Sequence, residues 1–266
     1  MIPKIIHYCW FGRNPKPKSA DRCISSWKKY CPDYQIIEWN EDNFDIDSTC
    51  EFVKQAYQEK KWAFVSDYAR LQVVHDHGGV YLDTDVELLK SLNGLISSGK
   101  GFMGFEKPDA VASGLGFAAE KGDEIIEEMM EYYSTLRFDS NNPAQVKCPI
   151  INTLVLQKHG LKLNNQLQII GNLQILPDDY LCPENMYTGK KHYTENTVSI
   201  HHYDASWMSS RSVLRQKIII TTKKLLPNRA VEKIQNLYRR KHSPNLRGGV
   251  SRNLLFVNYL GGYYAS

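Results

Sequence analysis

Much that would mark a membrane, secreted or zinc-binding protein is missing from this chain. No apolar run approaches the ~20 residues that a helix needs to cross a bilayer, so we expect no transmembrane segment. The first ten residues are too few and too polar for a secretory signal. The six cysteines include no C-x-x-C pair, which argues against a disulfide framework or a zinc site and fits a reducing cytoplasm. Internal repeats and low-complexity segments are also missing.

Acidic residues are nearly missing from the last part of the chain. Residues 208–266 contain 12 Lys and Arg but a single acid, Glu232, although the whole chain has a net charge of only +4. We therefore expect a body at 1–207 and a basic helical extension at 208–266, broken at Pro227. Such amphipathic basic helices suit an anionic membrane surface; the alternative is a solvated helical face that packs on the body. The body is acidic and the extension lacks interleaved aromatic residues, so we expect no nucleic-acid partner.

The 266 residues, 42% of them hydrophobic, are enough to bury a sizeable core. Residue patterns predict helices that alternate with strands along the body. The expected strands are 2–11, 34–39, 79–85, 102–105, 116–119, 173–176 and 197–202, and the expected helices are 19–30, 51–60, 63–77, 122–137 and 149–159. This alternation predicts an α/β fold with a mostly parallel central sheet flanked by helices.

Two carboxylates stand at the end of a predicted strand. Asp83 and Asp85 follow the apolar run 79–82, and side chains two apart in a strand point the same way. Facing carboxylates repel unless a cation lies between them, and a hard divalent ion with oxygen ligands fills that role. Such an ion with open positions can seat a diphosphate. On its own, an Asp-x-Asp triplet is more often only a polar turn.

Three further segments carry polar or aromatic residues that suit the same site. Asp67 and Arg70 are three apart on a predicted helix and share a face; they form either an exposed ion pair worth under ~1 kcal/mol or a clamp for a polyhydroxylated ring. Trp10 ends the first strand and is either a core residue or a platform for a flat base. Adjacent strand residues face opposite ways, so at most one of His201 and His202 can be a third metal ligand.

Phosphate-loop patterns also occur, but their context is wrong. Residues 94–100 resemble the start of a P-loop, yet Gly101 stands where Ser or Thr should hold Mg²⁺. Residues 99–104 spell G-x-G-x-x-G, but Pro108 follows too soon for a helix. We therefore expect neither an NTPase nor a dehydrogenase.

Taken together, four blocks resemble the DXD-containing sugar transferases. The blocks are 5–12, 66–70, 77–85, and His201-His202 with Ser206 and Trp207, and they span about residues 3–207 in order. That family includes the yeast initiating mannosyltransferase, bacterial capsule and O-antigen enzymes, and the catalytic domains of the glucosylating clostridial toxins. The resemblance implies a GT-A fold, a retaining mechanism, a nucleotide-diphospho-sugar donor that we expect to be UDP-linked, and Mn²⁺ or Mg²⁺.

The resemblance also implies roles for individual residues. By position, Trp10 would stack on the base, Tyr81 would lie near the nucleotide, Ser66 would lie beside the ribose or sugar, and Asp67 and Arg70 would hold sugar hydroxyls. Asp85 would bind the metal directly, Asp83 would share the metal and touch ribose or sugar, and His201 or His202 would complete the metal's ligand shell. Ser206 with Trp207 would close over the diphosphate. We count Asp67, Arg70, Asp83 and Asp85 as catalytic. The region from Phe102 to Leu176 should shape acceptor choice, with Asn152 as a candidate sugar contact.

The expected activity is transfer of a hexose (Glc, Gal or an N-acetyl form) to a glycan or lipid-linked oligosaccharide in bacterial surface polysaccharide synthesis. The expected location is cytoplasmic, peripheral at the inner face of the membrane. The alternatives are a toxin- or effector-like protein glucosyltransferase, and a catalytically silent protein that binds sugar nucleotides or acts as a lectin or scaffold.

Overall fold

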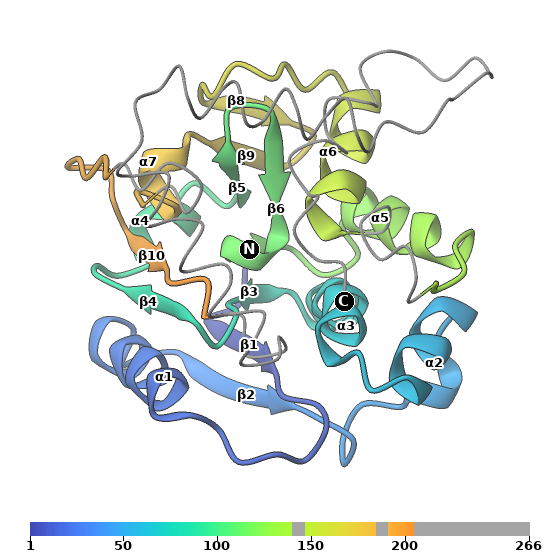
Figure 1. Ribbon diagram of the computed structural model, residues 1–266. Coiled ribbons are helices and arrows are strands. Elements are labelled where there is room, and N and C mark those ends of the chain that lie inside the picture. Colours follow the sequence, from blue (N-terminus) through green and yellow to red (C-terminus); the bar gives the residue numbers. More distant parts are fainter. Residues whose placement is uncertain (140–146, 185–190, 205–266) are drawn as a thin grey trace, which may run out of the picture.

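The computed structural model of the protein describes residues 1–139, 147–184 and 191–204 (Figure 1). Its centre is an eight-stranded sheet with the order β2-β1-β3-β7-β5-β9-β8, and β6 pairs with β5 beside it. The strands are β1 (Ile5–Cys9), β2 (Gln35–Trp39), β3 (Gly79–Tyr81), β5 (Gly101–Lys107), β6 (Ala110–Ala112), β7 (Phe117–Ala119), β8 (Gln168–Ile170) and β9 (Leu173–Leu176). The pairings make β2, β1, β3, β5 and β9 run one way, against β7, β6 and β8.

Helices cover both faces of this sheet, as Figure 1 shows. One hydrophobic core joins the sheet to α2 (Glu51–Gln58), α3 (Trp62–His77), α5 (Glu124–Ser134) and α6 (Cys148–Lys158). A second core lies on the other face, under α1 (Lys18–Tyr30), α4 (Asn93–Ile96) and α7 (Asp178–Leu181). Side chains along β5 point alternately to the two faces of the sheet, so Met103 and Phe105 pack in the first core and Phe102 packs in the second. The predicted α/β fold with a mostly parallel sheet between helices is confirmed.

The turn from α3 into β3 depends on two glycines. Gly78 caps α3 with a φ of 68°, and Gly79 follows with a φ of 111°, conformations that favour glycine. A Cβ on Gly79 would lie 2.9 Å from the Ile5 carbonyl oxygen of the neighbouring strand. The glycines therefore let a buried helix lead directly into the middle of the sheet, as the sequence predicted.

The strand after that turn is shorter than predicted, and this changes the argument for the two aspartates. β3 ends at Tyr81, and residues 83–85 form a turn in which the Val86 N–H donates to the Asp83 carbonyl, 2.9 Å away. The prediction that strand alternation aligns Asp83 with Asp85 is therefore wrong. The turn, not the pleat of a strand, sets the relation between the two carboxylates.

A two-stranded sheet follows this turn. β4 (Val86–Leu88) pairs antiparallel with β10 (Ser199–His201), and the register places His201 opposite Val86. The strand predicted for 197–202 is therefore present but shorter. Strands β4, β6 and β8, of three residues each, were not predicted.

Several predictions fall outside the described residues. These are the helical extension at 208–266 with its break at Pro227, and the contacts of Ser206 and Trp207. Within the part of the chain that the structure describes, no helix is both long and apolar enough to span a bilayer.

Candidate active site

A cavity of about 580 Å³ opens where β1, β3 and β5 end. That volume lies within the ~300–1,000 Å³ typical of small-molecule sites, and the carboxyl ends of parallel strands are where α/β sheets bind ligands. The first half of α3 and the start of α6 form two of its walls. Residues from four predicted blocks line it: Trp10, Ser66, Asp67, Arg70, Asp83 and His201.

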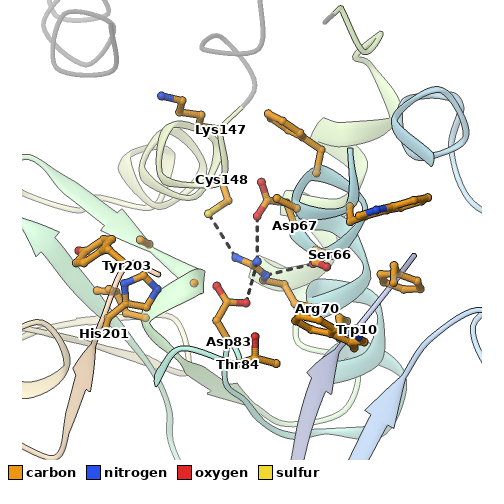
Figure 2. A pocket seen from close by; sticks show the side chains of 18 of the residues that line it. Trp10, Ser66, Asp67, Arg70, Asp83, Thr84, Lys147, Cys148, His201 and Tyr203 are labelled. Carbon is orange, nitrogen blue, oxygen red and sulfur yellow. Dashed lines mark hydrogen bonds and ion pairs between the residues drawn. The ribbon is translucent and has the colours of Figure 1, made fainter. Parts of the chain in front are cut away.

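Arg70 lies at the centre of the site (Figure 2). Its Nη2 is 3.1 Å from Asp67 Oδ1 and 3.1 Å from Asp83 Oδ1, and its Nε donates to the Ser66 carbonyl oxygen at 3.2 Å. The residue is only 4% exposed, so the interpretation as an exposed ion pair is wrong. A guanidinium held on three sides is fixed in place before any ligand arrives.

Burial raises the pKa values of the two aspartates that contact Arg70. The pKa of Asp67 is raised to about 6, chiefly by burial and also by the Asp83 charge, while Arg70 acts against the rise. Burial likewise raises the pKa of Asp83 despite Arg70. One guanidinium thus faces two carboxyl groups that are both reluctant to ionise, which is an environment that favours a further positive charge.

A third side chain joins the two aspartates of the turn. Ligand atoms of Asp83, Asp85 and His201 all lie within 4.8 Å of one another, because the β10–β4 pairing places His201 beside Asp85, with Nε2 3.2 Å from Asp85 Oδ1. His201 Nδ1 is buried and has no hydrogen-bond partner among the described residues. Two carboxylates and an imidazole at this spacing are a donor set that Mn²⁺ or Mg²⁺ fits.

Gly114 lies directly against Asp83 and Arg70, where a side chain would not fit. A Cβ on Gly114 would lie 2.9 Å from Asp83 Oδ2 and 3.1 Å from Arg70 Nη1. Gly114 belongs to the short turn Ser113–Leu115. This glycine therefore allows the backbone to lie against the carboxylate and guanidinium.

Neither His202 nor Tyr81 lines the cavity. His202 Nε2 lies 2.7 Å from Glu87 Oε2, so its ring is outside the cluster of Asp83, Asp85 and His201. Tyr81 is 1% exposed and does not line the cavity; its hydroxyl donates to Asp83 Oδ1 at 2.9 Å. Among the described residues, His201 and not His202 joins the two aspartates. Tyr81 supports Asp83 through its hydroxyl group, and its position near a nucleotide stays a prediction.

Asn152 is also placed differently from its prediction as a sugar contact. It is fully buried, and its Oδ1 accepts a hydrogen bond from the Ser113 N–H at 2.9 Å, while its Nδ2 donates to Met129 Sδ at 3.3 Å. Asn152 therefore fixes the turn that carries Gly114, and its effect on the cavity is indirect.

The aromatic end of the cavity combines a predicted and an unpredicted residue. Trp10 donates from Nε1 to the Asn14 carbonyl oxygen at 2.6 Å, which fixes its ring at the cavity. Trp62, Ser66 and Arg70 follow one another at four-residue spacing on α3 and line the same cavity. That spacing was the signal for Trp62, which the sequence analysis missed. In Figure 2, Trp10 and His201 lie on opposite sides of Arg70 and Asp83.

Other cavity residues were missed for want of a local signal. Glu106, Lys147, Cys148 and Tyr203 line it, and none belongs to the matched blocks. Cys148 lies close to the centre, since Arg70 Nη1 is 3.5 Å from its Sγ.

Comparisons with known proteins agree with the blocks read from the sequence. Residues 17–101 match the family model described as the glycosyltransferase sugar-binding region containing DXD motif. An uncharacterized glycosyltransferase of Acanthamoeba polyphaga mimivirus is 23% identical over 220 residues, which cover 78% of this chain and 84% of the relative.

Two solved structures are similar at a lower level. The PaToxG glycosyltransferase aligns with a TM-score of 0.48 and 22% identity, over 59% of this chain and 69% of the other. A glycosyltransferase involved in the glycosylation of the major capsid of PBCV-1 aligns with a TM-score of 0.45 and 12% identity, over 81% of this chain and 98% of the other. Similarity at this level says nothing about substrate.

The matched region holds the Asp-x-Asp turn together with Asp67 and Arg70, which the structure gathers around one cavity. The family resemblance read from the sequence is thereby confirmed: residues 17–101 match the family model of the glycosyltransferase sugar-binding region containing the DXD motif.

Proposed function

We propose that the chain is a metal-dependent, retaining glycosyltransferase that moves a hexose from a UDP-linked donor to a glycan or lipid-linked acceptor. The observation that carries this proposal is the cluster of Asp83, Asp85 and His201 beside the buried Arg70, at a cavity that Asp83, His201 and Arg70 line. Glc, Gal and their N-acetyl forms are the donor sugars that we place first, and surface polysaccharide synthesis at the cytoplasmic face of the membrane is the context. The DXD region itself is equally compatible with a toxin-like protein glucosyltransferase.

The residues of the cavity would bind a metal ion and the sugar of the donor. Asp83, Asp85 and His201 would hold Mn²⁺ or Mg²⁺, which when bound supplies positive charge against the charge that grows on the departing diphosphate. Arg70, fixed by Asp67 and Asp83, would hold donor hydroxyls, and Asp67 would accept hydrogen bonds from them.

The nucleoside end of the donor would lie at the aromatic part of the cavity. Trp10 would stack on the base with its ring held by the Asn14 carbonyl, and Ser66 would lie beside the ribose or sugar. Ser206 and Trp207 would close over the diphosphate. The basic extension at 208–266 would keep the enzyme near a lipid-linked acceptor on an anionic surface, which sedimentation with anionic liposomes at low salt tests.

Calorimetric titration with UDP, GDP and ADP, each with and without Mn²⁺, tests the proposal. We expect one nucleotide, UDP, to bind at least tenfold more tightly with the ion present, and a panel of UDP- and GDP-sugars to identify one donor that is hydrolysed slowly. Absence of any metal-dependent nucleotide binding would contradict the proposal. Binding without hydrolysis or transfer would instead favour the catalytically silent alternative.

Substitution of Gly114 tests the geometry of the site with little disturbance elsewhere. We expect Gly114→Ala to lower kcat/KM for donor hydrolysis roughly 10- to 100-fold, because the new methyl group crowds Asp83 Oδ2 and Arg70 Nη1 and displacement of positioned groups by about 1 Å can cost up to about 100-fold. Gly94→Ala is the matched control, since a Cβ there meets nothing within 4 Å. An effect of equal size in both variants would contradict the assignment.

A further inference from the structure

Glu106 lies at a β-bulge of the central sheet, between Phe105 and Lys107 of β5. In the antiparallel pair of β5 and β6, Phe105 lies opposite Val111 and Lys107 lies opposite Ala110, so Glu106 is the extra residue of a β-bulge. Bulges are enriched beside active sites, where they redirect one side chain. Here the bulge is at the cavity end of β5, and Glu106 lines the cavity.

Glu106 differs from the other acids of that cavity in its partners. Among the described residues, three acids line it: Asp67, Asp83 and Glu106. Asp67 and Asp83 both bind Arg70, and Asp83 also accepts the Tyr81 hydroxyl. In the described part of the chain, no side chain or backbone group forms a hydrogen bond or ion pair with the Glu106 carboxylate. It therefore has a free lone pair for a ligand.

Glu106 shares the cavity with Lys147, which stands at the start of α6. Burial lowers the pKa of Lys147 to about 8, and Glu106 is the main charge that opposes this change. Glu106 and Lys147 thus lie near one another on the wall of the cavity that Arg70 and Asp83 also line.

Building on the proposed function, we propose that Glu106 accepts the proton of the attacking hydroxyl group. The hydroxyl belongs to the acceptor, or to water when no acceptor is present. As the bond from its oxygen to the anomeric carbon forms, the bond from that carbon to the phosphate oxygen breaks, and the electron pair leaves with the diphosphate. The hydroxyl proton goes to Glu106, which later releases it to solvent. Asp67 and Asp83 are less suited to this task because Arg70 occupies them.

Azide rescue tests this assignment without knowledge of the acceptor. Hydrolysis of the donor identified by the panel should fall about 100- to 10,000-fold in Glu106→Ala and Glu106→Gln, the range for loss of a general base. Sodium azide, which has no proton to give up, should restore turnover in Glu106→Ala and yield a glycosyl azide with the donor's own anomeric configuration. The affinity for UDP with Mn²⁺ should stay within threefold in both variants. Glu131→Ala, an exposed position on α5, is the matched control and should hydrolyse donor normally.

Each other result contradicts the assignment. Hydrolysis within threefold of the unmodified protein in the Gln variant, or a loss that azide does not restore, removes the role of proton acceptor. A glycosyl azide of inverted configuration makes Glu106 a nucleophile instead. Loss of UDP binding in both variants makes it a donor-binding residue. A protein that binds no nucleotide before any substitution fails the proposed function, a result distinct from these.

Discussion

Replacing Asp85 with alanine is expected to abolish sugar transfer and leave the fold intact. Asp85 is the carboxylate nearest His201, and its other oxygen accepts a hydrogen bond from the Asp204 N–H at 3.0 Å. Loss of a metal ligand removes several kcal/mol of charge stabilisation in the transition state, and ~1.4 kcal/mol corresponds to tenfold in rate. We therefore expect kcat for donor hydrolysis with Mn²⁺ to fall at least ~1,000-fold, while the urea midpoint changes little.

The adjacent histidines supply an internal control for this experiment. His201→Ala should weaken Mn²⁺ binding on the order of 10- to 100-fold, as loss of groups at a metal site commonly does. His202→Ala should stay within threefold, because its ring pairs with Glu87 outside the cluster. Near-normal turnover of Asp85→Ala with Mn²⁺ present, or equal effects of the two histidine substitutions, would refute the metal assignment.

The parts of the site that could be predicted from the sequence are those that depend on local spacing. Asp67 and Arg70 share a helix face and meet at 3.1 Å, and the two glycines end α3 where the pattern indicated. Trp10 lines the cavity at the end of the first strand, as expected for a residue that contacts a ligand.

The parts that could not be predicted depend on pairing between distant segments. The choice between His201 and His202 is set by the register of β10 on β4, which no pattern within either strand encodes. Glu106 enters the cavity through a bulge that exists only relative to β6. Arg70 looked like half of an exposed ion pair because its burial comes from Tyr81, Asp83 and Cys148, which lie 11 or more positions along the chain. Similarly, the two aspartates converge through a turn where an extended strand was expected.

Removal of the Arg70 charge is expected to have the largest effect on stability. Arg70→Met leaves Asp67 and Asp83 buried without their cation, and breaking a buried ion pair in this way costs about 3–5 kcal/mol. Urea denaturation at pH 8 should show this loss. Arg70→Lys keeps the charge but not the planar fork, so it should recover part of the stability and little of the activity.

The pH dependence of the Arg70→Met destabilisation separates lost charge pairing from lost packing. Burial already raises the pKa of Asp67 from 3.8 to about 6, and removal of the guanidinium raises it further. A carboxyl group whose folded-state pKa exceeds its unfolded value binds a proton preferentially in the folded state, so stability is regained as pH falls through the folded pKa. The difference in unfolding free energy between Arg70→Met and the unmodified protein should therefore be smaller at pH 5 than at pH 8.

Adding Asp67→Asn to Arg70→Met should recover stability at pH 8 for the same reason, measured as a double-mutant cycle. A destabilisation that is independent of pH, and that the second substitution does not relieve, would mean that Arg70 stabilises the fold by packing alone.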